Sequence, residues 1–165
     1  ALSDPRDPSG YSATDLVSLG FLSTPSLAAL VESTQPVARL DAARFDALVV
    51  AGGQAPMFSF EGARTLQAKF AELYEAGAVV AALCHGVALL RYTRLSTGEL
   101  LVKGKTVTGF ANAEEDFADD AVWSMGALPR GTHLMPFRIE DELRRLGANF
   151  VQAGRFRAFA VRDGN

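Results

Sequence analysis

Two kinds of apolar pattern alternate along the chain. Continuous apolar runs, FDALVVA at residues 45–51 and AVVAAL at residues 78–83, are typical of strands that are buried on both faces of a sheet. Residues 24–33, 63–77 and 136–148 instead place apolar side chains three or four positions apart, which predicts amphipathic helices. This order predicts an α/β fold with a doubly wound, mostly parallel sheet and helices on both of its faces.

Capping and turn residues suggest where these elements begin and end. Thr24 is a good N-cap for the first helix, and Pro25 suits its first turn. Gly77 and Gly147 end the two later helices. GVALLRYT, from residue 86, opens a further helix, whereas LLVKGKTVTGF predicts a hairpin that turns at residues 103–105. ANFVQAGRFRAFAV predicts one or two closing strands.

The two ends of the chain predict an incomplete domain. ALSDPRDPSGYSATD, residues 1–15, carries no strand pattern, although the alternating fold follows at once. At the other end, FRAFAV is typical of a strand and RDGN of a hairpin turn, with no returning strand after it. We therefore expect residues 1–165 to form a single domain with a further strand on either side of it.

Composition and charge exclude several classes of protein. A chain of 165 residues with 48% hydrophobic and 21% charged residues is typical of one globular domain. The net charge of −3, without a Lys/Arg run, provides no basic patch for nucleic acid or an acidic membrane surface. One cysteine excludes an intrachain disulfide framework, and no Cys/His spacing predicts a metal site. No apolar run approaches the ~20 residues of a membrane span and no signal peptide opens the chain, so we expect a cytoplasmic protein.

The single cysteine lies where a strand is predicted to turn into a helix. Ala82-Leu83-Cys84-His85-Gly86 has the small-x-nucleophile-x-Gly form of a nucleophile elbow. Such a turn lifts the side chain out of the sheet, and a following helix N-terminus lowers the pKa of the thiol. We therefore expect Cys84 to be partly accessible, easily oxidised and in a sparsely populated backbone conformation, whereas an inert core cysteine would be fully buried.

A glycine turn follows the first predicted strand, at AGGQAPMF. A tight turn alone explains Gly52 and Gly53, and the stretch lacks the pattern of a phosphate-binding loop. Glycine also lets backbone N–H groups approach a substrate oxygen closely, as half of an oxyanion hole. Gln54 follows in the same turn and is a further candidate for substrate binding.

A cysteine nucleophile needs a base, and the chain offers two histidines. His133 lies in the polar turn LPRGTHLMP and is best interpreted as a surface histidine. His85 adjoins Cys84, and both side chains can reach one pocket from a strained elbow. The acidic run in TGFANAEEDFADD is mostly a solvated face, but one carboxylate, of Glu114 or Glu115, is expected to point inward and orient the histidine.

Three motifs in order, DALVVAGGQAPMF, VVAALCHG and VKGKTVTGFANAEE, resemble the DJ-1/PfpI superfamily, close to its Hsp31-like, class I glutamine-amidotransferase-like branch. The resemblance implies a flavodoxin-like fold with Cys84 as nucleophile, His85 as the histidine after it and Glu115 as the acidic partner. It also implies oxyanion contacts from the backbone amides of Gly53 and His85.

The chain departs from the resemblance in three places. Gln54 stands where many relatives have a histidine, and the segment of residues 119–136 is longer than in many relatives. That segment is expected to be a lid, a dimer contact or an ordinary surface loop. Relatives also supply a glutamate that hydrogen-bonds the cysteine from an opening strand, and residues 1–40 contain no counterpart.

The resemblance implies a class of chemistry. The preferred hypothesis is cofactor-free and metal-free addition of Cys84 to a small electrophilic carbonyl compound, a glyoxalase III-like conversion of a 2-oxoaldehyde to a hydroxy acid. The alternatives are a stress-response chaperone or redox sensor without turnover, and a cysteine amidohydrolase or peptidase. The expected partners are a small-molecule substrate and a second copy of the chain, since relatives usually form homodimers.

Overall fold

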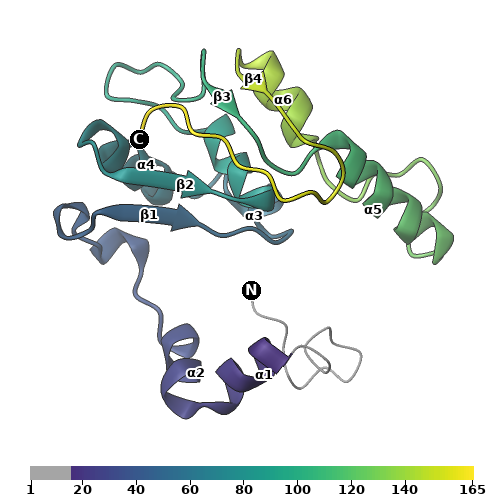
Figure 1. Ribbon diagram of the computed structural model, residues 1–165, viewed down its shortest axis with the longest axis horizontal. Helices are drawn as coiled ribbons and strands as arrows, with labels where there is room; N and C mark the ends of the chain where they lie inside the picture. The colour runs from purple at the N-terminus through teal and green to yellow at the C-terminus, as the bar shows by residue number, and fades with distance from the viewer. Residues whose placement is uncertain (1–15) are drawn as a thin grey trace. The chain divides into compact units, whose positions relative to one another are not determined.

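The computed structural model describes residues 16–165, and the chain divides into two compact units, one up to Leu40 and one from Asp41 to Asn165 (Figure 1). The predicted opening segment, residues 1–15, lies outside the described residues. The first unit contains helices α1 (Leu16–Ser23) and α2 (Pro25–Glu32) and the 3₁₀ turn η2 (Val37–Arg39). That residues 1–165 form a single domain remains a prediction.

The predicted helix at residues 24–33 is confirmed as α2. Pro25 opens it, because the missing N–H of proline is no loss in a first helical turn. Thr24 is the N-cap residue, as expected, but its hydroxyl donates to the carbonyl of Gly20 at 2.8 Å and does not cap α2.

In the second unit, the two predicted apolar runs form neighbouring parallel strands. After the turn η3 (Ala42–Arg44) come β1 (Ala47–Val50), the short helix α3 (Pro56–Ser59), α4 (Arg64–Glu75) and β2 (Val79–Ala82). β1 pairs with β2 in the register Ala47↔Val79 to Val50↔Ala82, and α4 is the crossover between them. Gly77 ends α4 in a left-handed conformation (φ 82°), as predicted.

The prediction that both strands are buried on both faces is wrong. Val50 is buried, but Val49 is 61% exposed and Val79 is 53% exposed. Alternate residues of a strand point to opposite faces, and within residues 41–165 one face of this pair is left open to solvent.

The second half of the unit contains a separate parallel pair. The 3₁₀ helix η4 (Cys84–Arg91) leads through turns to β3 (Thr106–Val107), α5 (Asn112–Ser124), α6 (Ile139–Arg145) and β4 (Asn149–Phe150). β3 pairs with β4 in the register Thr106↔Asn149 and Val107↔Phe150. The predicted helix after Cys84 is thus a 3₁₀ helix, and the helix predicted at residues 136–148 is confirmed as α6, with Gly147 (φ 92°) after it.

Two predictions for this half are wrong. The hairpin at residues 103–105 is absent, because residues 101–104 form turns and the carbonyl of Lys105 accepts from the amide of Asn149 at 2.8 Å, at the start of the parallel ladder of β3 and β4. The predicted strand at residues 156–161 is irregular chain, as is the rest of residues 151–165. Phe156 has a left-handed φ of 56°, which breaks an extended backbone, and its amide donates to Glu114 at 2.9 Å. The RDGN stretch forms a bend, in which Asp163 accepts from the amide of Thr106 at 2.7 Å.

The core of this unit surrounds η4. Its largest fully buried side chains are Phe150, Leu89, Ile139, Leu143, Val87, Val102 and Thr93. η4 therefore runs through the middle of the packed unit with Cys84 at its first residue. The packing of η4 against α3 and α6 fixes the position of the cysteine turn.

Candidate active site

Cys84 lies in the turn that joins β2 to η4. Leu83 is still extended, with φ −133° and ψ 154°, and Cys84 then takes a left-handed φ of 54°. This conformation costs an L-residue other than glycine about 1–2 kcal/mol, so the surrounding packing must hold it in place. Cys84 is half-buried. The expected strained backbone and partial accessibility of the thiol are both confirmed.

Two glycines allow the turn to pack closely. A Cβ added to Gly52 would lie 2.5 Å from the Cβ of Cys84 and 3.2 Å from its Sγ. A Cβ on Gly86 would lie 2.5 Å from the carbonyl oxygen of Ala51. Only glycine fits at both places, so the end of β1 and the cysteine turn are in direct contact.

The imidazole of His85 joins the thiol to a buried carboxylate. Its Nδ1 lies 3.6 Å from the Sγ of Cys84, and its Nε2 lies 3.1 Å from Oε1 of Glu115. His85 is 5% exposed and Glu115 is 2% exposed. The structure therefore brings Cys84, His85 and Glu115 together in the order expected of a nucleophile, a base and an orienting group.

The electrostatics of Cys84, His85 and Glu115 favour a negative charge on the thiol and a positive charge on the imidazole. The hydrogen bond from His85 lowers the pKa of Cys84, against the opposing effect of burial, and the backbone amides of His85 and Gly53 lower it further. Burial lowers the pKa of His85, but hydrogen bonds to Cys84 and Glu115 and the charges of both outweigh it and raise the pKa to about 9. Both shifts act in the same direction and favour a thiolate beside an imidazolium over a neutral thiol beside a neutral imidazole.

The two neighbouring glutamates of α5, Glu114 and Glu115, make different contacts. Glu114 points back along α5, where its Oε2 accepts from the amide of Ala111 at 2.9 Å and its Oε1 accepts from the amide of Phe156. Glu115, the next residue along the helix, points into the core toward His85. Glu114 thus caps α5 and holds the C-terminal segment, while Glu115 faces the site.

Three other residues were candidates for the site: Gly53, Gln54 and His133. Gly53 has a φ of 92° and directs its amide at the Cys84 sulfur, as a predicted oxyanion donor would. Gln54 is exposed in the same turn. His133 has a side chain that is 58% exposed and hydrogen-bonds Asp119 at 2.7 Å, which agrees with its interpretation as a surface histidine.

Among residues 16–165, no group of three or more His, Cys, Asp or Glu side chains is placed to hold a metal ion.

Sequence reasoning missed one close neighbour of the site. The ring of Phe110 stacks on the imidazole of His85, with ring centroids 4.1 Å apart and planes at 28°. Phe110 follows β3 and precedes α5, so the same connection that leads to Glu115 also places this ring. The signal was present as an aromatic residue in TGFANAEE, four to five positions before the paired glutamates.

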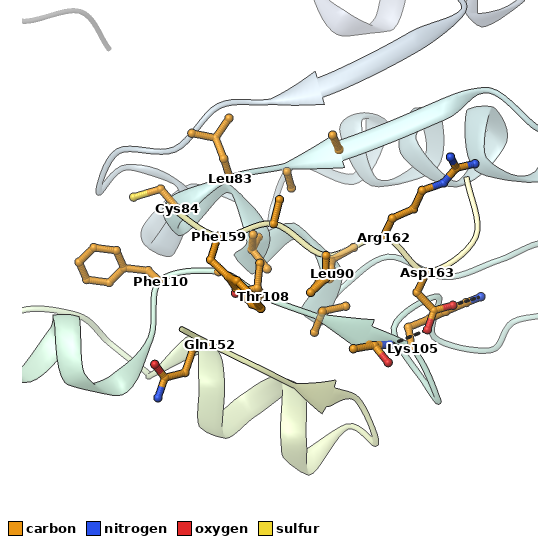
Figure 2. A pocket seen from close by; sticks show the side chains of 18 of the residues that line it. Leu83, Cys84, Leu90, Lys105, Thr108, Phe110, Gln152, Phe159, Arg162 and Asp163 are labelled. Atoms are coloured by element: carbon orange, nitrogen blue, oxygen red, sulfur yellow. Dashed lines mark hydrogen bonds and ion pairs between the residues drawn. The ribbon is translucent and has the colours of Figure 1, made fainter. Parts of the chain in front are cut away.

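Cys84 also lines a cavity of about 680 Å³ (Figure 2). β2, residues 105–111 and the C-terminal segment 152–165 surround it, with mostly apolar side chains. Cys84 and Phe110 lie at one end of the cavity, and the ion pair of Lys105 and Asp163, 3.2 Å apart, lies at the other. Cys84 therefore forms part of the wall at one end of a mostly apolar cavity.

Comparison with known proteins identifies the family. The sequence profile of the DJ-1/PfpI family matches residues 26–128. The chain belongs to the DJ-1/PfpI family. A probable glutathione-independent glyoxalase of Schizosaccharomyces pombe, hsp3103, is 33% identical over 139 residues, which cover 82% of this chain and 51% of that protein. Glyoxalase 3 of Candida albicans is 31% identical over 127 residues, 76% of this chain and 51% of that protein.

Solved structures of similar proteins confirm the predicted fold class. The crystal structure of glyoxalase III from C. albicans matches 89% of this chain and 60% of its own, with a TM-score of 0.73 and 25% identity. Rapid Encystment Protein 24 kDa of Francisella tularensis matches 95% of this chain and 65% of its own, with a TM-score of 0.80 and 26% identity. This DJ-1/PfpI chain therefore has the flavodoxin-like α/β fold. It spans about half the length of the curated relatives it matches.

The charge state of Cys84 can be tested by alkylation. We predict that iodoacetamide reacts with Cys84 with a pH midpoint below the ~8.5 of a free thiol, because His85 stabilises the thiolate. Glu115→Gln removes a charge that keeps His85 protonated and should raise this midpoint, slowing alkylation at pH 7 by about tenfold. Glu114→Gln is the matched control and should leave the midpoint unchanged. A wild-type midpoint at or above that of a free thiol would contradict the assignment.

Proposed function

We propose that this DJ-1/PfpI protein converts a 2-oxoaldehyde to a 2-hydroxy acid without glutathione, with Cys84 as the nucleophile. The observation that carries the proposal is the continuous line of Cys84, His85 and buried Glu115, in which the thiol pKa is lowered and the imidazole pKa is raised. The names of the similar S. pombe and C. albicans proteins support the choice of substrate class.

The first step is addition of the Cys84 thiolate to the aldehyde carbon. The carbonyl oxygen gains the electron pair of the C=O bond and becomes an oxyanion. The amides of Gly53 and His85, which already point at the sulfur, are placed to stabilise this charge, and the His85 imidazolium donates the proton that gives a hemithioacetal. Glu115 holds the ring in place through the transfer.

The second step is an internal oxidation and reduction. Neutral His85 removes the proton from the former aldehyde carbon and returns it to the neighbouring ketone carbon, while the hydroxyl of the hemithioacetal gives up its proton and the ketone oxygen gains one. The aldehyde carbon becomes a thioester and the ketone becomes an alcohol, so no outside electron acceptor is needed. Water then hydrolyses the thioester, which releases the 2-hydroxy acid and restores the thiolate, for a net addition of one water.

The same thiolate supports a second candidate function, that of a redox sensor. A half-buried cysteine with a lowered pKa has the properties of a thiol that oxidises to sulfenic acid. A sensor needs no turnover, whereas the proposed enzyme does. The two functions are therefore separated by kinetics with a 2-oxoaldehyde substrate.

The turnover of methylglyoxal tests the proposed roles. We expect Cys84→Ala to abolish the formation of lactate by the full-length protein, because the covalent step is lost. Glu115→Gln should lower kcat about 10²-fold or more through loss of a positioned acid and base. Glu114→Gln should change kcat little, since Glu114 contacts the backbone and not His85. Wild-type turnover that survives in Cys84→Ala would reject the mechanism.

We also propose that the protein forms a homodimer through the segment of residues 119–136. Residues 119–124 of this segment belong to α5, and Met125, directly after the helix, is 73% exposed. The turns that follow are tied to the helix by bonds from Trp123 Nε1 to Thr132 O (2.8 Å) and from the amide of Leu134 to Asp119 (2.8 Å). An exposed apolar side chain at the end of an ordered helix could be covered by a second copy of the chain. Light scattering should give the mass of a dimer, and Met125→Glu should shift it toward a monomer; a wild-type monomer at micromolar concentration would reject the proposal.

A further inference from the structure

Phe110 covers one face of the imidazole ring of His85. The ring centroids are 4.1 Å apart and the planes differ by 28°, which is a stacked geometry. The two nitrogens of His85 are engaged at the ring edge, by the sulfur of Cys84 and by the carboxylate of Glu115. These two contacts lie in the plane of the imidazole and leave it free to tilt out of that plane. The stacked ring of Phe110 restrains this tilt.

A glycine sets the distance between the two rings. A Cβ on Gly109 would lie 3.0 Å from both Cβ and Cγ1 of Val87, which is itself 2% exposed in the core. The backbone before Phe110 thus rests directly on η4, two residues after His85. Ala111, on the other side of Phe110, is buried and begins the turn into α5. Both flanks of Phe110 are fixed by packing, so its place over His85 is built into the fold.

An aromatic face beside an imidazolium has an electrostatic consequence as well. The face of a phenyl ring carries partial negative charge and attracts a cation within about 6 Å of its centroid. His85 is the cationic member of the thiolate–imidazolium pair, and it is shielded from water on this side by Phe110. The ring thus favours protonated over neutral imidazole without adding a charge of its own.

We propose that Phe110 is a positioning residue of this site: its ring keeps the imidazole of His85 in line between Cys84 and Glu115 and favours its cationic form. Phe110 acts through His85 and not on the reacting atoms. The inference extends the proposed function, but its first readout is a titration and does not require turnover.

The protonation of His85 also depends on the charged groups around it. Cys84 on η4 and Glu115 on α5 act on His85 directly. Arg138, before α6, is within electrostatic reach of Glu115, and it forms ion pairs with Asp116 at 2.7 Å and Asp119 at 3.2 Å. These groups remain in a Phe110 variant. If the titration of His85 changes in such a variant, the cause is therefore the loss of the aromatic ring and not the loss of a charge.

The test is a pH titration of His85 by NMR in the full-length protein, with its signal separated from that of the other histidine of this segment by His133→Gln. Phe110→Leu should lower the midpoint of His85 by about half a pH unit, because the aromatic face is lost while an apolar side chain remains. It should raise the alkylation midpoint of Cys84 correspondingly. Phe110→Tyr keeps the face and should restore both midpoints. Phe117→Leu is the matched control, since that exposed ring packs edge-on against Phe156, and it should change neither.

Each outcome decides the proposal. A shift in Phe110→Leu that Phe110→Tyr rescues supports it. Unchanged midpoints in Phe110→Leu, or equal shifts in the Leu and Tyr variants, would overturn it, because the aromatic face would then have no role of its own. If Phe110→Leu does not fold, a fluorinated phenylalanine at residue 110 has nearly the same shape and a weaker negative face, and it should shift the midpoint in the same direction. A wild-type protein that titrates as expected but turns over no 2-oxoaldehyde would reject the proposed function and leave the role of Phe110 intact.

Discussion

The site depends on the close contact between the end of β1 and the turn at Cys84. Any side chain at residue 52 would collide with the Cβ of Cys84, and any side chain at residue 86 would collide with the carbonyl oxygens of Val50 and Ala51. With both glycines in place, the chain turns from strand to helix at one strained residue. That turn directs the sulfur toward the amides of Gly53 and His85, so one packing constraint places both the proposed nucleophile and the donors that lower its pKa.

The charge pair follows from a second constraint, the burial of Glu115. A buried carboxylate needs a partner, and His85 is the one that it contacts within the core. The raised pKa of His85 and the lowered pKa of Cys84 are therefore two results of the same arrangement. Phe110 completes the enclosure of the imidazole on one face. The neighbouring Glu114 serves the fold instead, as a cap for α5 and an anchor for Phe156.

The sequence was most informative where local chemistry and long-range packing agree. The small residues around Cys84 predicted the strained elbow because only glycine fits where two backbones touch. The apolar pattern predicted β1, β2, α4 and α6, but it overestimated the burial of Val49 and Val79, since a pattern of apolar residues does not say what covers them. The hairpin at residues 103–105 failed because Lys105 and Thr106 pair with residues far away in the chain. The residues alone did not distinguish Glu115 from Glu114, and only the resemblance favoured Glu115, because the answer depends on the direction of α5. The stacking of Phe110 could not be predicted either, because it depends on how closely Gly109 packs against Val87.

In the proposed mechanism, catalysis passes through the sulfur of Cys84. The most direct measurement is the turnover of a 2-oxoaldehyde as Cys84 is progressively blocked with a small methylthiolating reagent, with the blocked fraction measured by peptide mass spectrometry. We expect activity to fall in proportion to the blocked fraction, substrate to protect the thiol, and reduction of the mixed disulfide to restore activity in full. Activity that persists when Cys84 is fully blocked would contradict this mechanism.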